Sequence, residues 1–513
     1  MAGTEQREEE QHAQNAFDMN SVVGQRDLEH EITFALLFNW FIGWPVIFLS
    51  FVGLTITISK KYVTEPFIDE IFHIPQTIQY FNGDFKTWDP KITTPPGLYY
   101  LGYIWSKFIQ LTHLPINPIG LGSLRLLNTI GGTLVLPFVL NPLFILNPIG
   151  FWPISIVLFP ILSSFYTLYY TDVWSTVLIV TSLSLAVALP YGDVKSVRLS
   201  AFVAFLSIWF RQTNIIWNLF ILVLVIERRA LIEKKFNKSF LNNCIKFVIQ
   251  FFEDFWDFSL PFIINVILFT GFIIYNRGIT LGDKENHVAG LHIAQVFYCF
   301  TFLTVFTTPL WISEFRIKTY LRRYKRLPIV ILLEFIIMAI VIRFFTVVHP
   351  FLLADNRHYT FYIWRKIINL RWWTKYLMIP IYHFSINIVT QQLSENGFYF
   401  DSITPLPIKE PKDLPLKPTG ISIIMLIICI ILTIVPSPLF EPRYYILPFI
   451  FFRLFIAVPY EGFFIGGSLN DITLTRLKLE LALFVIINII TFVIFISYTF
   501  PWESESALQR IIW

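Results

Sequence analysis

Charged residues are scarce in this 513-residue chain. Asp, Glu, Lys and Arg together make up only 14% of it, whereas about a quarter is usual in soluble domains. This shortage excludes an ordinary soluble protein. Apolar residues take the place of the charged ones: 55% of the chain is hydrophobic, phenylalanine alone occurs 54 times, and the mean hydropathy is +0.61. The composition therefore predicts a polytopic membrane protein whose surroundings are a lipid bilayer.

Cysteine and histidine are also few. The three cysteines, Cys244, Cys299 and Cys429, stand far apart, in or beside apolar segments. This spacing excludes a disulfide framework and a zinc site of closely spaced cysteines. The nine histidines are scattered, so we predict no transition-metal centre and no cofactor. A divalent ion held by the adjacent acids Asp69 and Glu70 stays open, because carboxylates are common ligands of such ions.

The usual signatures of nucleotide and nucleic-acid binding are missing. The chain has no GxxxxGKS phosphate loop and no GxGxxG motif after a strand. The segment DEIFH at 69–73 contains a single histidine and cannot form the HExxH site of a metalloprotease. The net charge of +4 is spread over loops, and residues 5–11 form the acidic run EQREEEQ. We therefore expect no nucleic acid among the partners.

Apolar windows of about 20 residues recur along the chain, and they predict an all-α membrane protein with about 12–14 transmembrane helices. A polar cytosolic tail (1–31) precedes a single transmembrane domain (32–500), and a short C-terminal tail (501–513) follows. The windows lie at 33–58, 123–146, 151–170, 172–190, 198–226, 257–276, 291–313, 328–348, 373–392, 419–436, 444–458 and 477–499.

Two segments make the number of spans uncertain. Residues 97–114 are apolar but contain polar residues, so they are either a span or a helix lying in the membrane interface. Residues 198–226 are interrupted by FRQTN at 210–214. Because an arginine in the middle of a span is costly, we expect two short segments that turn around Arg211 at the membrane surface.

The distribution of Lys and Arg predicts the orientation. The strongest basic clusters, at 227–238 and 315–326, are separated by two spans and can lie in the cytosol together. The linker 394–418, rich in Pro and Lys, is then cytosolic as well. On the opposite side we expect three loops, at 60–96, 349–371 and 437–443.

Adjacent acids, Asp69 and Glu70, follow the first apolar segment. In a helix that starts near Asp69, His73 (i+4) and Gln76 (i+7) share one polar face, while the apolar residues gather opposite. The pattern predicts an interfacial amphipathic helix in the first loop. A carboxylate held at a membrane surface is a candidate general base, and the alternative is that the two acids merely solvate a loop.

Further polar residues fall in loops predicted on the same side. They suit an anionic lipid head group, because guanidinium groups hold phosphate oxygens bidentately. The alternatives are that the arginines reach the membrane edge with their apolar stems buried and that the histidine is an ordinary interface residue. These candidate substrate-binding residues, beside His73 and Gln76, are Arg211, Asp355, Arg357, His358, Tyr359 and Arg443.

Several motifs carry a family resemblance that extends from about residue 33 to about residue 500. The chain resembles the endoplasmic-reticulum alpha-1,2-glucosyltransferases, which use dolichyl phosphate glucose to add the last glucose to the lipid-linked oligosaccharide precursor of N-glycans. The motifs are FIDEIFHIPQ, WDPKITTPPGLYY, FRQTN, HPFLLADNRHYTFYIWR and EPRYYILP.

The resemblance implies a multi-span fold of the GT-C glycosyltransferase type in the endoplasmic reticulum membrane, with the active site at the luminal surface. The partners would be the dolichyl phosphate glucose donor and the dolichyl-pyrophosphate-linked oligosaccharide acceptor. Asp69 matches the acid that the family places as catalytic base, and Glu70 is its neighbour in the motif.

A single inverting displacement fits this resemblance, because the donor sugar is beta-linked and the product linkage is alpha. Asp69 would accept the proton of the acceptor 2-hydroxyl, and Arg357, His358 or Arg443 would neutralise the leaving phosphate. Three alternatives stay open: a related lipid-linked sugar transferase with another acceptor, a transporter, and a non-catalytic membrane subunit that modulates a channel. A transporter would show inverted repeats and charges near mid-span, whereas these polar residues cluster in loops.

Overall fold

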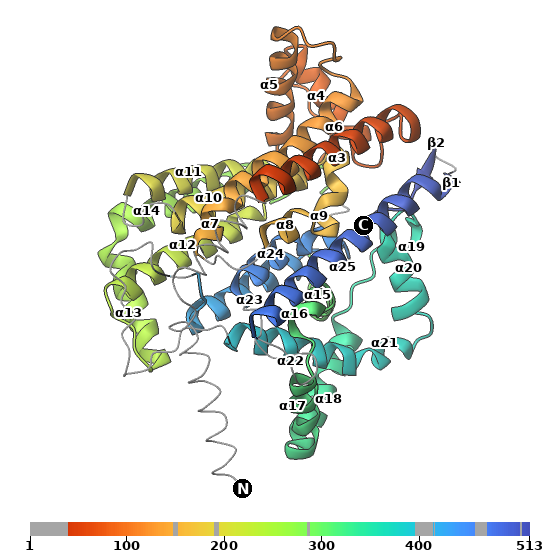
Figure 1. The fold of residues 1–513 in the computed structure, drawn as a ribbon. Coiled ribbons are helices and arrows are strands. Elements are labelled where there is room, and N and C mark those ends of the chain that lie inside the picture. Colours follow the sequence, from red (N-terminus) through yellow and green to blue (C-terminus); the bar gives the residue numbers. More distant parts are fainter. Residues whose placement is uncertain are drawn as a thin grey trace.

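The computed structural model describes residues 39–146, 152–188, 194–284, 288–395, 414, 416–456, 469–502 and 505–513. The predicted tail 1–31 and most of the linker 394–418 lie outside them. Within the described residues the chain is almost entirely helical, as predicted (Figure 1). The exception lies in the predicted C-terminal tail, where β1 (Thr499–Trp502) and β2 (Glu505–Arg510) form an antiparallel hairpin.

The helices occur in all three parts of the chain, N-terminal, middle and C-terminal. The N-terminal part contains α3 (Trp44–Thr57), α4 (Glu70–Phe81), α5 (Gly97–Leu111), α6 (Leu121–Ile130), α7 (Leu136–Leu146), α8 (Trp152–Val157), α9 (Pro160–Ser164) and α10 (Thr171–Val187). The middle part contains α11 (Val194–Ile208), α12 (Asn214–Ile232), α13 (Phe240–Glu253), α14 (Leu260–Asn276), α15 (Ala294–Phe306), α16 (Thr308–Trp311), α17 (Glu314–Arg326) and α18 (Pro328–Phe344). The last part contains α19 (Pro350–Ala354), α20 (Tyr359–Ile363), α21 (Thr374–Leu377), α22 (Ile379–Glu395), α23 (Gly420–Ile434), α24 (Ile446–Phe455) and α25 (Leu469–Ser497).

Fewer helices than predicted are long enough to span a membrane on their own. Among the described residues four stretches qualify by length and apolar composition: Phe41–Tyr62, Leu121–Phe144, Phe255–Asn276 and Thr475–Ser497. A fifth is the pair α17 and α18, which is bent by 99°. The other apolar windows fold as shorter helices. In the window 151–170, for example, Pro160 starts a new helix, α9, because proline cannot continue α8.

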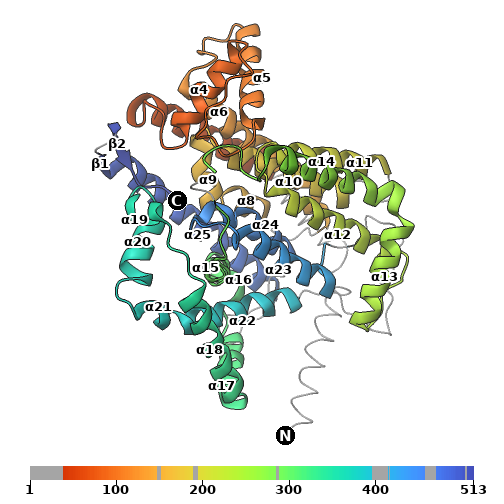
Figure 2. The same ribbon diagram turned by 180° about the vertical axis from the view of Figure 1, so that it is seen from behind.

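The predicted turn around Arg211 is confirmed. The window 198–226 folds as two helices, α11 and α12, and the connection between them carries Arg211. The other ambiguous segment, 97–114, forms α5, which lies beside α4 at one end of the molecule (Figures 1 and 2). The helices α17 and α18 protrude at the opposite end. The first loop and the basic segment 315–326 are therefore far apart, as the predicted orientation requires.

Aromatic stacking fixes helix α24 in the centre of the helical body. Phe449 stacks on Phe159 with ring centroids 3.9 Å apart and planes 4° apart. Two residues further on, Phe451 stacks on Trp217 of α12 at 4.8 Å, again 4° from parallel. Because the turn 441–445 leads directly into α24, this packing also fixes the turn that carries Arg443.

Candidate active site

Asp69 is the N-cap residue of α4, so the structure confirms a helix that starts at the predicted place; its location at a membrane interface stays a prediction. The preceding residue, Ile68, has a φ of 51°, a left-handed conformation that costs energy for a β-branched side chain. This turn separates Asp69 from the first span. The Asp69 carboxylate makes no capping hydrogen bond to α4 and is 32% exposed. It therefore stays available for chemistry outside the helix.

Glu70 points the other way, into the protein. Its carboxylate accepts hydrogen bonds from Arg125 Nε at 2.9 Å and Nη2 at 2.6 Å, and from the backbone N–H groups of Phe67 at 2.9 Å and Tyr169 at 2.7 Å. Both charged side chains are fully buried. Arg125 also donates to the carbonyl of Val63 at 2.7 Å. The geometry thus favours a positioning role for Glu70: with Arg125, it anchors the segment that carries Asp69.

Arg443 reaches Asp69 from the turn before α24. Its Nη1 lies 2.7 Å from Asp69 Oδ2, and its Nε donates to Glu441. Burial opposes ionisation of Asp69, but the neighbouring Arg443, with contributions from His73 and His358, lowers the pKa of Asp69 to about 2. Asp69 is thus a carboxylate at neutral pH, and it can accept a proton.

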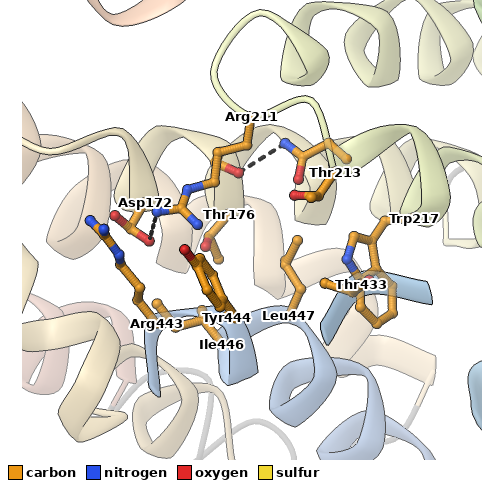
Figure 3. A pocket seen from close by; sticks show the side chains of 12 residues that line it. Asp172, Thr176, Arg211, Thr213, Trp217, Thr433, Arg443, Tyr444, Ile446 and Leu447 are labelled. Atoms are coloured by element: carbon orange, nitrogen blue, oxygen red, sulfur yellow. Dashed lines mark hydrogen bonds and ion pairs between the residues drawn. The ribbon is translucent and has the colours of Figure 1, made fainter. Parts of the chain in front are cut away.

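Arg211 lies next to this group. Its Nη2 lies 2.8 Å from Asp172 Oδ1, and its guanidinium lies over the ring of Tyr444, 5.7 Å from the centroid. Arg211 and Arg443 line the same pocket (Figure 3). The structure thus brings together Asp69, Arg211 and Arg443 from three loops that are far apart in the sequence.

His73 and Gln76 lie on α4 as predicted, but both are buried. His73 Nδ1 and the Tyr99 hydroxyl are 2.8 Å apart. Burial lowers the pKa of His73 to about 4, although Asp69 acts in the opposite direction, so the imidazole is neutral at pH 7. The Gln76 amide donates to the carbonyl of Thr87 at 2.8 Å and accepts from the N–H of Asp89 at 3.0 Å. Gln76 therefore holds the first loop.

Arg357 is paired with an acid of its own loop. It forms a bidentate pair with Asp355, with Nε to Oδ1 at 2.9 Å and Nη2 to Oδ2 at 2.7 Å. Its guanidinium also lies over the ring of Trp502, 4.6 Å from the centroid, and its Nη1 lies 3.4 Å from Gln509 Oε1. These contacts indicate that Arg357 stabilises the conformation of its own loop.

The residues that follow the C-terminal hairpin contact the neighbouring residues of that loop. The backbone of Ile512 donates to the Arg357 carbonyl at 2.8 Å and accepts from the N–H of Tyr359 at 3.0 Å. The ring of Tyr359 packs on Trp513 at 4.7 Å. His358 lies between Arg357 and Tyr359 in the sequence. It is near enough to Asp69 and Glu441 to lower the pKa of both carboxyl groups. His358 is thus the residue of this loop that faces the candidate site.

Sequence reasoning missed both supports of the site. Arg125 falls inside an apolar window, and a charge there indicates a buried partner or a functional site; that signal was available. The hairpin residues after Phe500 lie outside the apolar windows and carry no comparable signal. They were therefore predicted as a short tail. Its anchor is Arg510, which donates to the carbonyls of Tyr62 at 2.7 Å and Phe495 at 2.7 Å.

The acidic pair Asp69 and Glu70 does not form a common ligand set. Glu70 is occupied by Arg125, and Asp69 faces Arg443. Within the described ranges no group of three or more His, Cys, Asp or Glu side chains could hold a metal ion. The cationic side chain in contact with Asp69 is therefore Arg443, and Arg211 lines the pocket beside it.

Comparisons with known proteins assign the chain to a family. Residues 63–454 match the DIE2/ALG10 family. A Candida glabrata protein is 49% identical over 95% of this chain and 95% of its own length, and a Kluyveromyces lactis protein is 48% identical over 97% and 93%. A Homo sapiens protein is 30% identical over 88% and 94%. Each of the three is named Dol-P-Glc:Glc(2)Man(9)GlcNAc(2)-PP-Dol alpha-1,2-glucosyltransferase. No solved structure matches the chain.

Proposed function

Because the chain belongs to the DIE2/ALG10 family, we propose that it is the alpha-1,2-glucosyltransferase that its relatives are named for. It transfers glucose from dolichyl phosphate glucose to Glc(2)Man(9)GlcNAc(2)-PP-dolichol. The observation in the structure that supports this function best is the ionised, partly exposed Asp69 carboxylate beside Arg443. Incubating the purified protein with donor and diglucosylated acceptor, followed by mass analysis of the glycan, tests it. If the mass of the acceptor glycan does not increase by that of one hexose, the proposed function is refuted.

Asp69 serves as the general base of a single displacement. It takes the proton of the acceptor 2-hydroxyl while that oxygen attacks C1 of the donor glucose from the face opposite the phosphate. The bond between C1 and the phosphate oxygen breaks, and its electron pair stays on the phosphate. This route inverts the beta-linked donor to an alpha product without a covalent glycosyl-enzyme.

Arg443 is the most suitable residue for binding the donor phosphate. Its guanidinium is already aligned by Glu441 and lies 2.7 Å from Asp69, so a phosphate beside Asp69 can accept from it. When the phosphate accepts the hydrogen bond that Arg443 Nη1 otherwise donates to Asp69, Asp69 loses an interaction that keeps its pKa low. Donor binding would thus strengthen the base at the moment when it is needed. His358 lies close enough to contribute to the lowered pKa of Asp69 as well.

Replacing Arg443 by Lys tests this role. Lysine keeps the charge but cannot form the bidentate contact, so we expect the donor KM to rise, or turnover to fall, by an amount equivalent to about 1.5–3 kcal/mol. Arg198→Lys is a matched control, because Arg198 forms an exposed ion pair with Asp257. Unchanged donor kinetics in Arg443→Lys would exclude a bidentate contact between Arg443 and the phosphate, because lysine retains only the charge.

Replacing Arg357 by Ala distinguishes phosphate binding from loop support. The bidentate pair with Asp355 and the contacts to the hairpin predict a lower melting temperature and a smaller effect on the donor KM than Arg443→Lys produces. Both quantities can be measured on one preparation. An unchanged melting temperature together with a donor KM that rises at least tenfold would instead restore Arg357 as a phosphate ligand.

We also infer a GT-C arrangement in the endoplasmic reticulum membrane, with about 12–14 segments crossing the bilayer when short and broken helices are included. The loops 60–96, 349–371 and 437–443 would then be luminal, and the segments 227–246 and 314–327 cytosolic. Glycosylation sequons inserted into one loop at a time should be modified in the luminal loops and not in the cytosolic segments. Modification of a sequon within 227–246 would overturn this orientation.

A further inference from the structure

A pocket opens beside Arg443, at the ends of several helices. It is enclosed by the start of α10, the connection that carries Arg211, the start of α12, the end of α23 and the turn into α24 (Figure 3). Arg211 and Arg443 stand on the side of the pocket where Asp172 lies, and Trp217 and Thr433 stand on the other. The pocket therefore leads away from the proposed phosphate contact toward the interior.

Three polar atoms of residues in the pocket wall have no hydrogen-bond partner among the described residues. They are Asp172 Oδ2, Asn214 Oδ1 and Trp217 Nε1. The three residues are 2%, 0% and 0% exposed, and a buried polar group that stays unsatisfied destabilises a fold. An arrangement of this kind is stable when a bound group completes the hydrogen bonds.

The remaining atoms of these residues are already in use, which fixes how the free atoms point. Asp172 Oδ1 is taken by Arg211 at 2.8 Å. The Asn214 amide nitrogen donates to Ser175 Oγ and to the Ser207 carbonyl, both at 2.8 Å. The Trp217 ring is fixed by its stacking on Phe451.

The chemistry of the three free atoms matches a sugar hydroxyl. Two are acceptors and one is a donor, and a hydroxyl group can both donate and accept. A neutral hydroxyl suits these three atoms better than an anion, because two of them are acceptors that cannot donate to it, whereas Arg211 and Arg443 offer their charge on the side of the pocket where Asp172 lies (Figure 3). The volume open to the centre of a water molecule is about 20 Å3, enough for roughly one water molecule. The pocket can thus receive a hydroxyl or hydroxymethyl group, whereas the rest of a sugar ring must lie at its mouth, toward Arg443.

We propose that this pocket recognises the hydroxyl edge of a glucosyl residue, either that of the donor or the terminal one of the acceptor. The inference rests on the proposed function, since both substrates present glucose next to Asp69. It assigns Asp172, Asn214 and Trp217 to sugar specificity. A site built to bind a hydroxyl group discriminates strongly against a ligand that lacks it, because its buried polar atoms then stay unpaired.

Trp217→Phe is the sharpest test, since it removes the N–H donor and keeps a ring for stacking on Phe451. We expect the KM of one glucosylated substrate to rise about three- to tenfold, and Asp172→Asn to affect the same substrate. Inhibition by dolichyl phosphate, which carries no sugar, should stay unchanged. Trp209→Phe provides the matched control, because Trp209 is 40% exposed.

The outcomes separate the possibilities. A rise confined to the donor KM assigns the pocket to the donor glucose, and a rise confined to the acceptor KM assigns it to the acceptor. The proposal is overturned if both KM values stay within about twofold of wild type in both variants, which would leave a water site. It is also overturned if dolichyl phosphate inhibits the variants more weakly, in parallel with the donor KM, since the pocket would then serve the phosphate. A wild-type protein that transfers no glucose would refute the proposed function itself.

Discussion

Asp69→Asn is expected to lower the rate of glucose transfer by about a hundred- to ten-thousandfold, the range that general-base catalysis contributes. The amide has nearly the same shape as the carboxylate but cannot accept the proton. Because the Asp69 side chain is partly exposed, the protein should fold normally, and donor binding should be retained. The measurements are the initial rate of transfer, the donor KM and the melting temperature.

Asp84→Asn is the matched control, since Asp84 belongs to the same loop and accepts hydrogen bonds from the backbone N–H groups of Lys86 and Thr87, which lie two and three residues further along the chain. A variant at Asp69 that retains more than about a tenth of the wild-type rate would exclude the base role.

The pH profile gives an independent signature of the same role. A base must be deprotonated to act, so activity exists above its pKa and is lost as the pH falls through it. At low donor concentration the loss should come only as the pH approaches about 2, the pKa of Asp69 in the free protein. At saturating donor the loss should move to higher pH, if the phosphate draws Arg443 away from Asp69.

Arg125→Ala is expected to have the largest effect on stability. Removing one partner of a buried ion pair leaves the other charge uncompensated, which costs about 3–5 kcal/mol. Glu70 and Arg125 are both fully buried, and Arg125 also binds the Val63 carbonyl. We therefore expect a strong loss of folded protein, measured as melting temperature in detergent. Activity should fall with it, because the segment carrying Asp69 loses its anchor.

A double variant, Glu70→Gln with Arg125→Met, separates charge from packing. Replacing both charges removes the uncompensated one, so this variant should be more stable than Arg125→Ala. Arg198→Ala serves as the control for an exposed pair, which contributes little. A melting temperature in Arg125→Ala as high as in the control would contradict the anchoring role.

The sequence by itself determined those features that depend on local pattern. The scarcity of charge predicted a membrane protein, and the spacing of Asp69, His73 and Ile74 predicted α4, because helix periodicity is a local property. The cost of an arginine in a span predicted the turn at Arg211. The motifs also pointed to Asp69 and to the correct family.

Only the tertiary structure decided how those residues are paired. Asp69 and Glu70 are neighbours in sequence, yet one faces Arg443 and the other is enclosed with Arg125. Arg357 and Arg443 were both candidate phosphate ligands, and the structure pairs Arg357 with Asp355 and places Arg443 beside Asp69. Arg125 reaches Glu70 from 55 residues away and Arg443 reaches Asp69 from 374 residues away, and hydrogen bonding in a poorly solvated interior depends on the distance and direction between such partners. Periodicity along the chain carries neither quantity.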